Sequence, residues 1–161
     1  MVQNLMPRYL SEHFSLDELT QSNTAARRGI DNTPSPGIIS ALTRTAALLE
    51  TARKILRGAP IVVSSGYRCK ALNDAVGGAK ASAHISGLAA DIICPAYGSP
   101  FEVAQALAAS KLAYDQIIHE FGQWVHIGLA PMGEQPRRQA LSIFEPGAYQ
   151  PGILERRDHL K

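Results

Sequence analysis

The chain has 161 residues, enough for one domain with a single buried core. Hydrophobic residues make up 45% and charged residues 19%, as in ordinary globular proteins, and the aromatic share of 6% argues against a surface of stacking rings like those of lectins or single-strand nucleic-acid binders. The formal net charge of +2 is too small to indicate nucleic-acid binding, although it would suit weak attraction to an anionic polymer.

The N-terminal third predicts an arm followed by a long helix. Residues 1–36 are expected to form an arm that packs on the domain, with a short helix at 15–19 that begins at a serine. The cluster 32–37 contains two prolines and a glycine, which a helix cannot run through. From 37 to 56, apolar residues recur at three-to-four spacing, which predicts an amphipathic helix.

The rest of the chain predicts short strands and helices. Strands are expected at 61–65, 89–93, 115–120 and 124–129, and helices at 70–76 and 100–112. Three residues including a glycine join the last two strands, which predicts a hairpin. Beyond residue 130, proline, glycine and arginine are frequent, so 131–161 is expected to be an irregular tail. The prediction is one α+β domain over 1–130, in which a small antiparallel sheet is flanked by helices.

The chain ends and cysteines bear on location and redox state. The first eight residues lack a basic stretch followed by an apolar one, so no signal peptide is predicted and synthesis in the cytoplasm is expected. No apolar run approaches the ~18 residues of a membrane span. Cys69 and Cys94 form no paired metal-binding spacing and no disulfide framework, so both are expected to be reduced and structural. A monomer is expected.

Three segments carry residues suited to metal chemistry: 64–68 (SSGYR), 82–91 (SAHISGLAAD) and 124–127 (WVHI). A catalytic zinc site usually takes three protein ligands from histidine, aspartate, glutamate or cysteine, and leaves one position for water. Two imidazoles and one carboxylate in these segments provide that number. Their spacing differs from the compact helical H-E-x-x-H motif, so the ligands would come from a loop end and two strands.

The string S-x-H-x-x-G-x-A-x-D, preceded by S-G-Y-R and followed by W-V-H, resembles a family of zinc enzymes, the D-Ala-D-Ala carboxypeptidases and L-Ala-D-Glu endopeptidases. That family shares a fold with lysostaphin-type peptidases and the hedgehog signalling domain. The segment 12–19 (EHFSLDEL) also resembles the phage-borne branch of the family. The resemblance runs from about residue 11 to 130 and implies a zinc peptidase that acts on bacterial cell wall.

The resemblance also implies roles for individual residues. It implies that His84, Asp91 and His126 bind zinc. It places Arg68 in the substrate cleft, where the planar guanidinium would bind a substrate carboxylate or stabilise an oxyanion. Ser82 would help to hold the substrate or the surroundings of the metal.

The general base is where the chain departs from the family pattern. Many relatives have a carboxylate three residues before the last zinc-binding histidine, but this chain has Gln123, which cannot act as a base. If the predicted hairpin pairs Glu120 with Trp124, then Glu120 is a diagonal neighbour of His126 on the same face, about 7–8 Å away. Glu120 is therefore predicted to be the base, although a one-residue slip in register would turn it away. His119 would point to the opposite face.

Three functions are compatible with these patterns. The leading hypothesis is a zinc peptidase that cuts peptidoglycan stem peptides or cross-links, as a phage or prophage lysin released by a holin or carried in a virion. The second is a zinc-containing binding or virion structural module without catalysis, which Gln123 favours. The third is a zinc amidohydrolase for a different amide, since fold resemblance does not fix a substrate. No nucleic-acid or membrane partner is expected, and the bond that is cut stays open.

Overall fold

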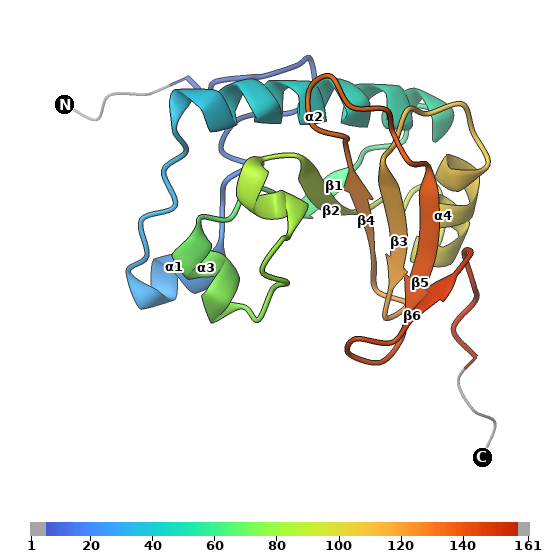
Figure 1. Ribbon diagram of the computed structural model, residues 1–161. Helices are drawn as coiled ribbons and strands as arrows, with labels where there is room; N and C mark the ends of the chain where they lie inside the picture. The colour runs from blue at the N-terminus through green and yellow to red at the C-terminus, as the bar shows by residue number, and fades with distance from the viewer. Residues whose placement is uncertain (1–5, 158–161) are drawn as a thin grey trace.

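A computed structural model describes residues 6–157, and they form a six-stranded sheet in the order β1-β2-β4-β3-β5-β6 (Figure 1). The strands are β1 (Val62–Ser65), β2 (Ala89–Ile93), β3 (Gln116–Glu120), β4 (Trp124–Gly128), β5 (Gln139–Ile143) and β6 (Tyr149–Pro151). The helices are α1 (Asn23–Arg28), α2 (Pro36–Ile55), α3 (Lys70–Ala75), the 3-10 helix η1 (Ala83–Ser86) and α4 (Pro100–Ala108). None of these helices is long and apolar enough to cross a membrane. The predicted α+β class is confirmed.

The two longest helices begin at side chains that cap their free backbone N–H groups. Ser35 accepts a hydrogen bond from the N–H of Ile38, and Pro36 occupies the first turn of α2, where its missing N–H costs nothing. At the start of α4, Ser99 and Glu102 form a reciprocal capping box. Both helices therefore begin within one residue of the predicted positions.

The two faces of the sheet have different roles. Ile117 and Val125 point to the face that packs against α2 and α4, where the hydrophobic core lies. Because side chains alternate along a strand, Ile118, Glu120 and His126 point to the other face. α2 and α4 thus cover one face of the sheet, and the other face carries the candidate site residues.

The β3–β4 hairpin has the predicted register. Glu120 pairs with Trp124, and Ile118 lies opposite His126. Gly122 in the connection has a φ of 67°, a left-handed conformation that glycine adopts without steric cost. The register fixes which side chains of the hairpin face the open side of the sheet.

The expected irregular tail is wrong for much of 131–157, and residues 158–161 lie outside the described part of the chain. β5 pairs with β3 in parallel, and β6 pairs with β5 antiparallel. The sheet is therefore antiparallel except for one pair. Most of the prolines and glycines in this region lie outside the two short strands, but Pro151 is the last residue of β6. The partner of β5 lies about twenty residues earlier, so local composition could not reveal the pairing.

The N-terminal arm packs on the domain through Phe14 and Leu19, which are buried in the core. The helix predicted at 15–19 is only a set of turns, although Ser15 and Glu18 exchange the expected capping hydrogen bonds. A helix that was not predicted, α1, follows immediately, with Ser22 as its N-cap. The helix in this part of the chain therefore begins at Ser22 and not at the predicted Ser15.

Candidate metal centre

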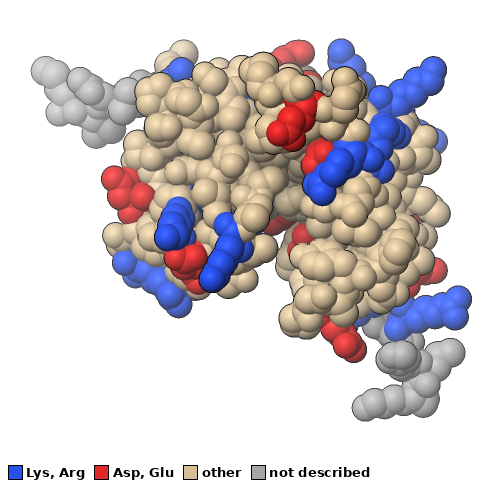
Figure 2. All heavy atoms as spheres, viewed as in Figure 1, with Lys and Arg blue, Asp and Glu red and all other residues tan. Residues whose placement is uncertain are grey.

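A cleft of about 570 Å³ lies on the open face of the sheet. One wall is the segment that runs from the end of α3 to η1, and the other is formed by β5, β6 and the loop between them. Figure 2 shows the surface hollowed between the part that contains α1 and α3 and the part that contains β5 and β6. All the candidate site residues predicted from the sequence line this cleft: Arg68, Ser82, His84, Asp91, Glu120 and His126.

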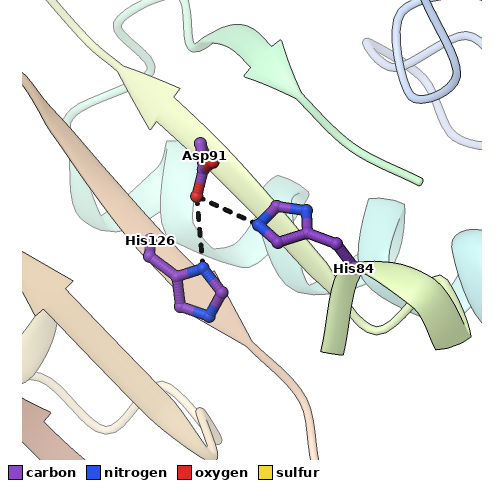
Figure 3. Close-up of side chains that lie close together, drawn as sticks. All are labelled: His84, Asp91 and His126. Atoms are coloured by element: carbon purple, nitrogen blue, oxygen red, sulfur yellow. Dashed lines mark hydrogen bonds and ion pairs between the residues drawn. The ribbon is translucent and has the colours of Figure 1, made fainter. Parts of the chain in front are cut away.

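Three of these residues form a group that could hold a metal ion: His84 from η1, Asp91 from β2 and His126 from β4 (Figure 3). β2 and β4 are neighbouring strands, and Asp91 lies directly opposite His126. Nε2 of His84 lies 3.2 Å from Oδ1 of Asp91, and Nδ1 of His126 lies 3.1 Å from the same oxygen. All three side chains are buried. The arrangement brings two ring nitrogens and one carboxylate oxygen to a single point.

The hydrogen bonding of His84 indicates that this point suits a cation. Its Nδ1 lies 2.7 Å from the carbonyl oxygen of Gly66, which can only accept, so Nδ1 carries the hydrogen. In a neutral imidazole, Nε2 then presents a lone pair to the oxygen of Asp91, and two lone pairs repel. A metal ion between them removes this conflict, and a carbonyl partner on the far nitrogen is the usual arrangement for a metal-binding histidine. The residues therefore fit a divalent metal.

The charge state of Asp91 agrees with a ligand role. Burial alone would raise the pKa of this carboxyl, but the neighbouring His84 and His126 more than offset burial and hold the pKa below its ordinary value. Asp91 is therefore ionised at neutral pH, as a metal ligand must be.

Small residues and one hydroxyl hold the His84 segment in place. The Ser82 hydroxyl accepts a hydrogen bond from the His84 backbone N–H at 3.3 Å. Gly87 ends η1 with a φ of 70°, which turns the chain into β2. Gly66 lies so close to the backbone of Leu19 that a Cβ would be 2.3 Å from the Leu19 carbonyl oxygen. A side chain at Gly66 would therefore push away the carbonyl that orients His84.

Arg68 offers a positive charge at the cleft. Its backbone N–H donates to the carbonyl of His84, and its guanidinium is half-buried. Nε of Arg68 is buried and has no hydrogen-bond partner within residues 6–157. Burial lowers the pKa of Arg68, while the negative charges of Asp91 and Glu120 act in the opposite direction. A guanidinium nevertheless stays protonated at neutral pH, so Arg68 presents an unused cationic donor.

Glu120 is the carboxylate of the cleft that is not part of the metal group. Burial raises its pKa, and the negative charge of Asp91 adds to this effect. His126 and Arg68 lower the pKa, as does the indole N–H of Trp124, although Trp124 makes no hydrogen bond of regular geometry. The net result is a raised pKa, which brings the carboxylate closer to the basicity that a general base needs near neutral pH.

Gln123 and His119 both lie outside the cleft. Gln123 is exposed in the hairpin turn and does not line the cleft. His119 points to the opposite face, where its Nδ1 lies 2.8 Å from the carbonyl oxygen of Leu154 and donates to it. Its ring packs between Phe101 and Phe144. His119 therefore belongs to the core and anchors the C-terminal segment.

Sequence reasoning missed the contribution of the C-terminal segment to the cleft. Ile143, Tyr149 and Arg137 all line it, and Arg137 is held by two-pronged hydrogen bonds to Asp115, the shortest 2.7 Å long. No motif marks these residues, and the expectation of an irregular tail concealed them. The pairing of β5 with β3 and of β6 with β5 brings Ile143 and Tyr149 to the site, and Asp115 holds Arg137 there.

The burial of His119 predicts a loss of stability in acid. Burial lowers the pKa of His119 from its ordinary 6.5 in the folded chain. As the pH falls below about 6.5, His119 is protonated in the unfolded chain before it is protonated in the folded chain. The free energy of unfolding therefore decreases with falling pH until the pKa of His119 in the folded chain is reached. Urea unfolding between pH 5 and 8 should show a shallower pH slope for His119→Asn than for the wild type; equal slopes would contradict the assignment.

The comparisons with known proteins agree with the geometry. A family model described as Peptidase M15 matches residues 12–128, which is well over half of the chain. A comparison with curated proteins finds no match. The matched segment contains the whole His84, Asp91 and His126 group. The chain belongs to the peptidase M15 family, whose members are metal-dependent peptidases.

Proposed function

We propose that the chain is a zinc-dependent peptidase that hydrolyses peptide bonds in bacterial peptidoglycan, in stem peptides or in cross-links. One observation carries the proposal: Nε2 of His84 and Nδ1 of His126 converge on Oδ1 of Asp91 inside a cleft that also contains Glu120 and Arg68. Membership of the peptidase M15 family supports the reaction class. Peptidoglycan as the substrate, and zinc as the metal, follow from the resemblance of the motif string to D-Ala-D-Ala and L-Ala-D-Glu peptidases.

The donor set supports zinc as the metal. Two imidazole nitrogens and one carboxylate oxygen are the typical three protein ligands of a catalytic zinc site, and such a set leaves a position open. When bound, zinc acts as a Lewis acid and makes hydroxide available near neutral pH. His84, Asp91 and His126 would hold the ion, and the carbonyl of Gly66 would fix the ring orientation of His84.

The other cleft residues would transfer the proton, stabilise negative charge and bind the substrate. Glu120, with its raised pKa, accepts a proton from the attacking water and returns it to the amine that leaves. Arg68 lines the same cleft, and its guanidinium stabilises negative charge on the carbonyl oxygen of the substrate. Ser82 holds the backbone N–H of His84 and offers its remaining hydrogen-bonding capacity to the substrate.

We propose further that the peptidase is a phage or prophage lysin, which reaches the cell wall after holin-type release or from a virion. The basis is the resemblance of segment 12–19 to the phage-borne branch of the family. The alternative, a zinc-containing module without catalysis, rested on the glutamine at position 123. That argument is weaker because Gln123 lies outside the cleft and Glu120 lies within it.

The test is cleavage of purified peptidoglycan by the zinc-loaded chain. Walls of Gram-negative and Gram-positive type would be incubated with the protein, and released peptides identified by mass spectrometry. New amino and carboxyl ends, abolished by a chelator and restored by zinc, are expected and would also identify the bond that is cut. If no wall is cleaved by any zinc-loaded sample, the peptidase proposal fails and the non-catalytic module takes its place.

A further inference from the structure

A row of side chains crosses four strands next to the candidate metal centre. Glu120 on β3 is the register partner of Trp124 on β4 and of Ile143 on β5, and Ile143 is the partner of Tyr149 on β6. Register partners on neighbouring strands project to the same face of a sheet. All four residues line the cleft. The row lies two residues, or about 7 Å, along the strands from the row that contains two of the metal-binding candidates.

The β5–β6 hairpin is fixed firmly against this row. The backbone N–H of Phe121 donates to the carbonyl oxygen of Ile143 at 2.7 Å. The Ser142 hydroxyl donates to the carbonyl oxygen of Gly152 and accepts from the N–H of Leu154, both at 2.8 Å. Ser142 and Ile143 are buried. Hydrogen bonds to Phe121 and to the segment after β6 therefore fix the hairpin as one wall of the cleft.

The cleft has one apolar end and one polar end. At the hairpin end, the rings of Phe121 and Trp124 lie 5.6 Å apart, and Pro146 adds further apolar surface. At the opposite end, the Asp115–Arg137 ion pair provides the lining. The two ends therefore differ: aromatic rings line the hairpin end, and an ion pair lies at the other.

Tyr149 is the exposed member of the apolar end. Its side chain is 53% exposed on the three-residue strand that forms the edge of the sheet, so the fold itself gains little from an aromatic ring there. Burial and the nearby charge of Glu120 both raise the pKa of Tyr149, so its phenol is neutral beside that carboxylate. An uncharged ring at the rim of a cleft is suited to cover an apolar ligand group.

We infer that the β5–β6 hairpin forms the outer wall of a substrate subsite next to the bond that is cut, in which Tyr149 contacts an apolar side chain of the peptide. The inference rests on the proposed peptidase function and adds a specificity element to it. The hairpin lies beyond residue 128, where the family match ends. Tyr149 is a substrate-binding residue, and its ring rather than its hydroxyl makes the contact.

The chain offers a direct probe of this subsite, because Trp124 is its single tryptophan. Soluble muropeptides from peptidoglycan digested with a muramidase would be titrated into the zinc-loaded, full-length chain. A Glu120→Gln background would keep them intact, and tryptophan fluorescence would be recorded. Steady-state cleavage of the same muropeptides would be measured in the wild-type background. The variants are Tyr149→Ala and Tyr149→Phe, with Tyr9→Ala as control, since Tyr9 is 58% exposed and lies outside the cleft.

Tyr149→Ala is expected to raise both Kd and KM roughly tenfold while kcat changes less than about twofold, because only binding contacts are removed. Tyr149→Phe and Tyr9→Ala are expected to match the wild type. Wild-type cleavage with equal KM in all variants would overturn the inference alone, as would a loss of kcat without a change in KM. Absence of both binding and cleavage in the wild type would overturn the peptidase proposal and the subsite with it.

Discussion

Replacing His126 with alanine is expected to weaken zinc binding by roughly a hundredfold or more and to abolish peptidase activity. The substitution removes one of three convergent donors and leaves His84 and Asp91 as an incomplete set. Changes to groups that merely orient a ligand typically cost about 10–100-fold in metal affinity, so loss of the ligand itself should cost at least as much. Competition with a chromogenic chelator would measure the affinity, and elemental analysis the bound metal.

His119→Asn is the matched control, because His119 is a buried histidine of the neighbouring strand that points to the opposite face. It is expected to retain wild-type zinc affinity. If His126→Ala and His119→Asn bind zinc equally well, the assignment of the His84, Asp91 and His126 group as the metal site is wrong. Circular dichroism on both variants would show that each chain remains folded.

Glu120→Gln is expected to lower kcat by about 10²–10⁴-fold while zinc affinity stays within about twofold of the wild type. The amide has nearly the same shape as the carboxylate but cannot accept and return a proton. Because Glu120 is not part of the metal group, its neutralisation should leave the ligand set intact. The readouts are steady-state kinetics on soluble muropeptides and the zinc affinity of the same preparation.

Position 123 provides a sharp control for the base. Gln123 is exposed and outside the cleft, so Gln123→Ala should keep wild-type activity. For the same reason, Gln123→Glu should fail to rescue Glu120→Gln, even though it restores a carboxylate where many relatives have one. Rescue by Gln123→Glu, or normal kcat in Glu120→Gln, would show that the base lies elsewhere.

Much of the candidate site could be predicted because it depends on short sequence motifs and on the register of one hairpin. The motif strings mark His84, Asp91 and His126 through family resemblance, and the structure places their donor atoms within 4.8 Å of one another. The position of Glu120 in the cleft followed from hairpin register alone, because a three-residue connection pairs Glu120 with Trp124. Strand alternation then decides which side chains share a face.

The C-terminal half of the cleft could not be predicted, because it depends on contacts that are distant in the sequence. β5 has no strong alternation, since two of its residues are half-buried and two are buried in succession. Its parallel partner is β3, which is separated from it in the sequence by β4 and by a segment without a helix or strand. Tyr149 and Ile143 therefore reach the site by topology, without any motif of their own.

The hydrogen bond from His84 to the Gly66 carbonyl couples metal occupancy to protons. With Nδ1 committed as a donor, Nε2 and the Asp91 oxygen form a stable pair only when something positive lies between them. A metal ion bound by His84 and Asp91 would meet that need. Because the ligands must be deprotonated to bind a metal, acidification is expected to weaken metal binding at this site. The hydrogen bond that orients His84 therefore also makes protons and metal ions compete for the same position.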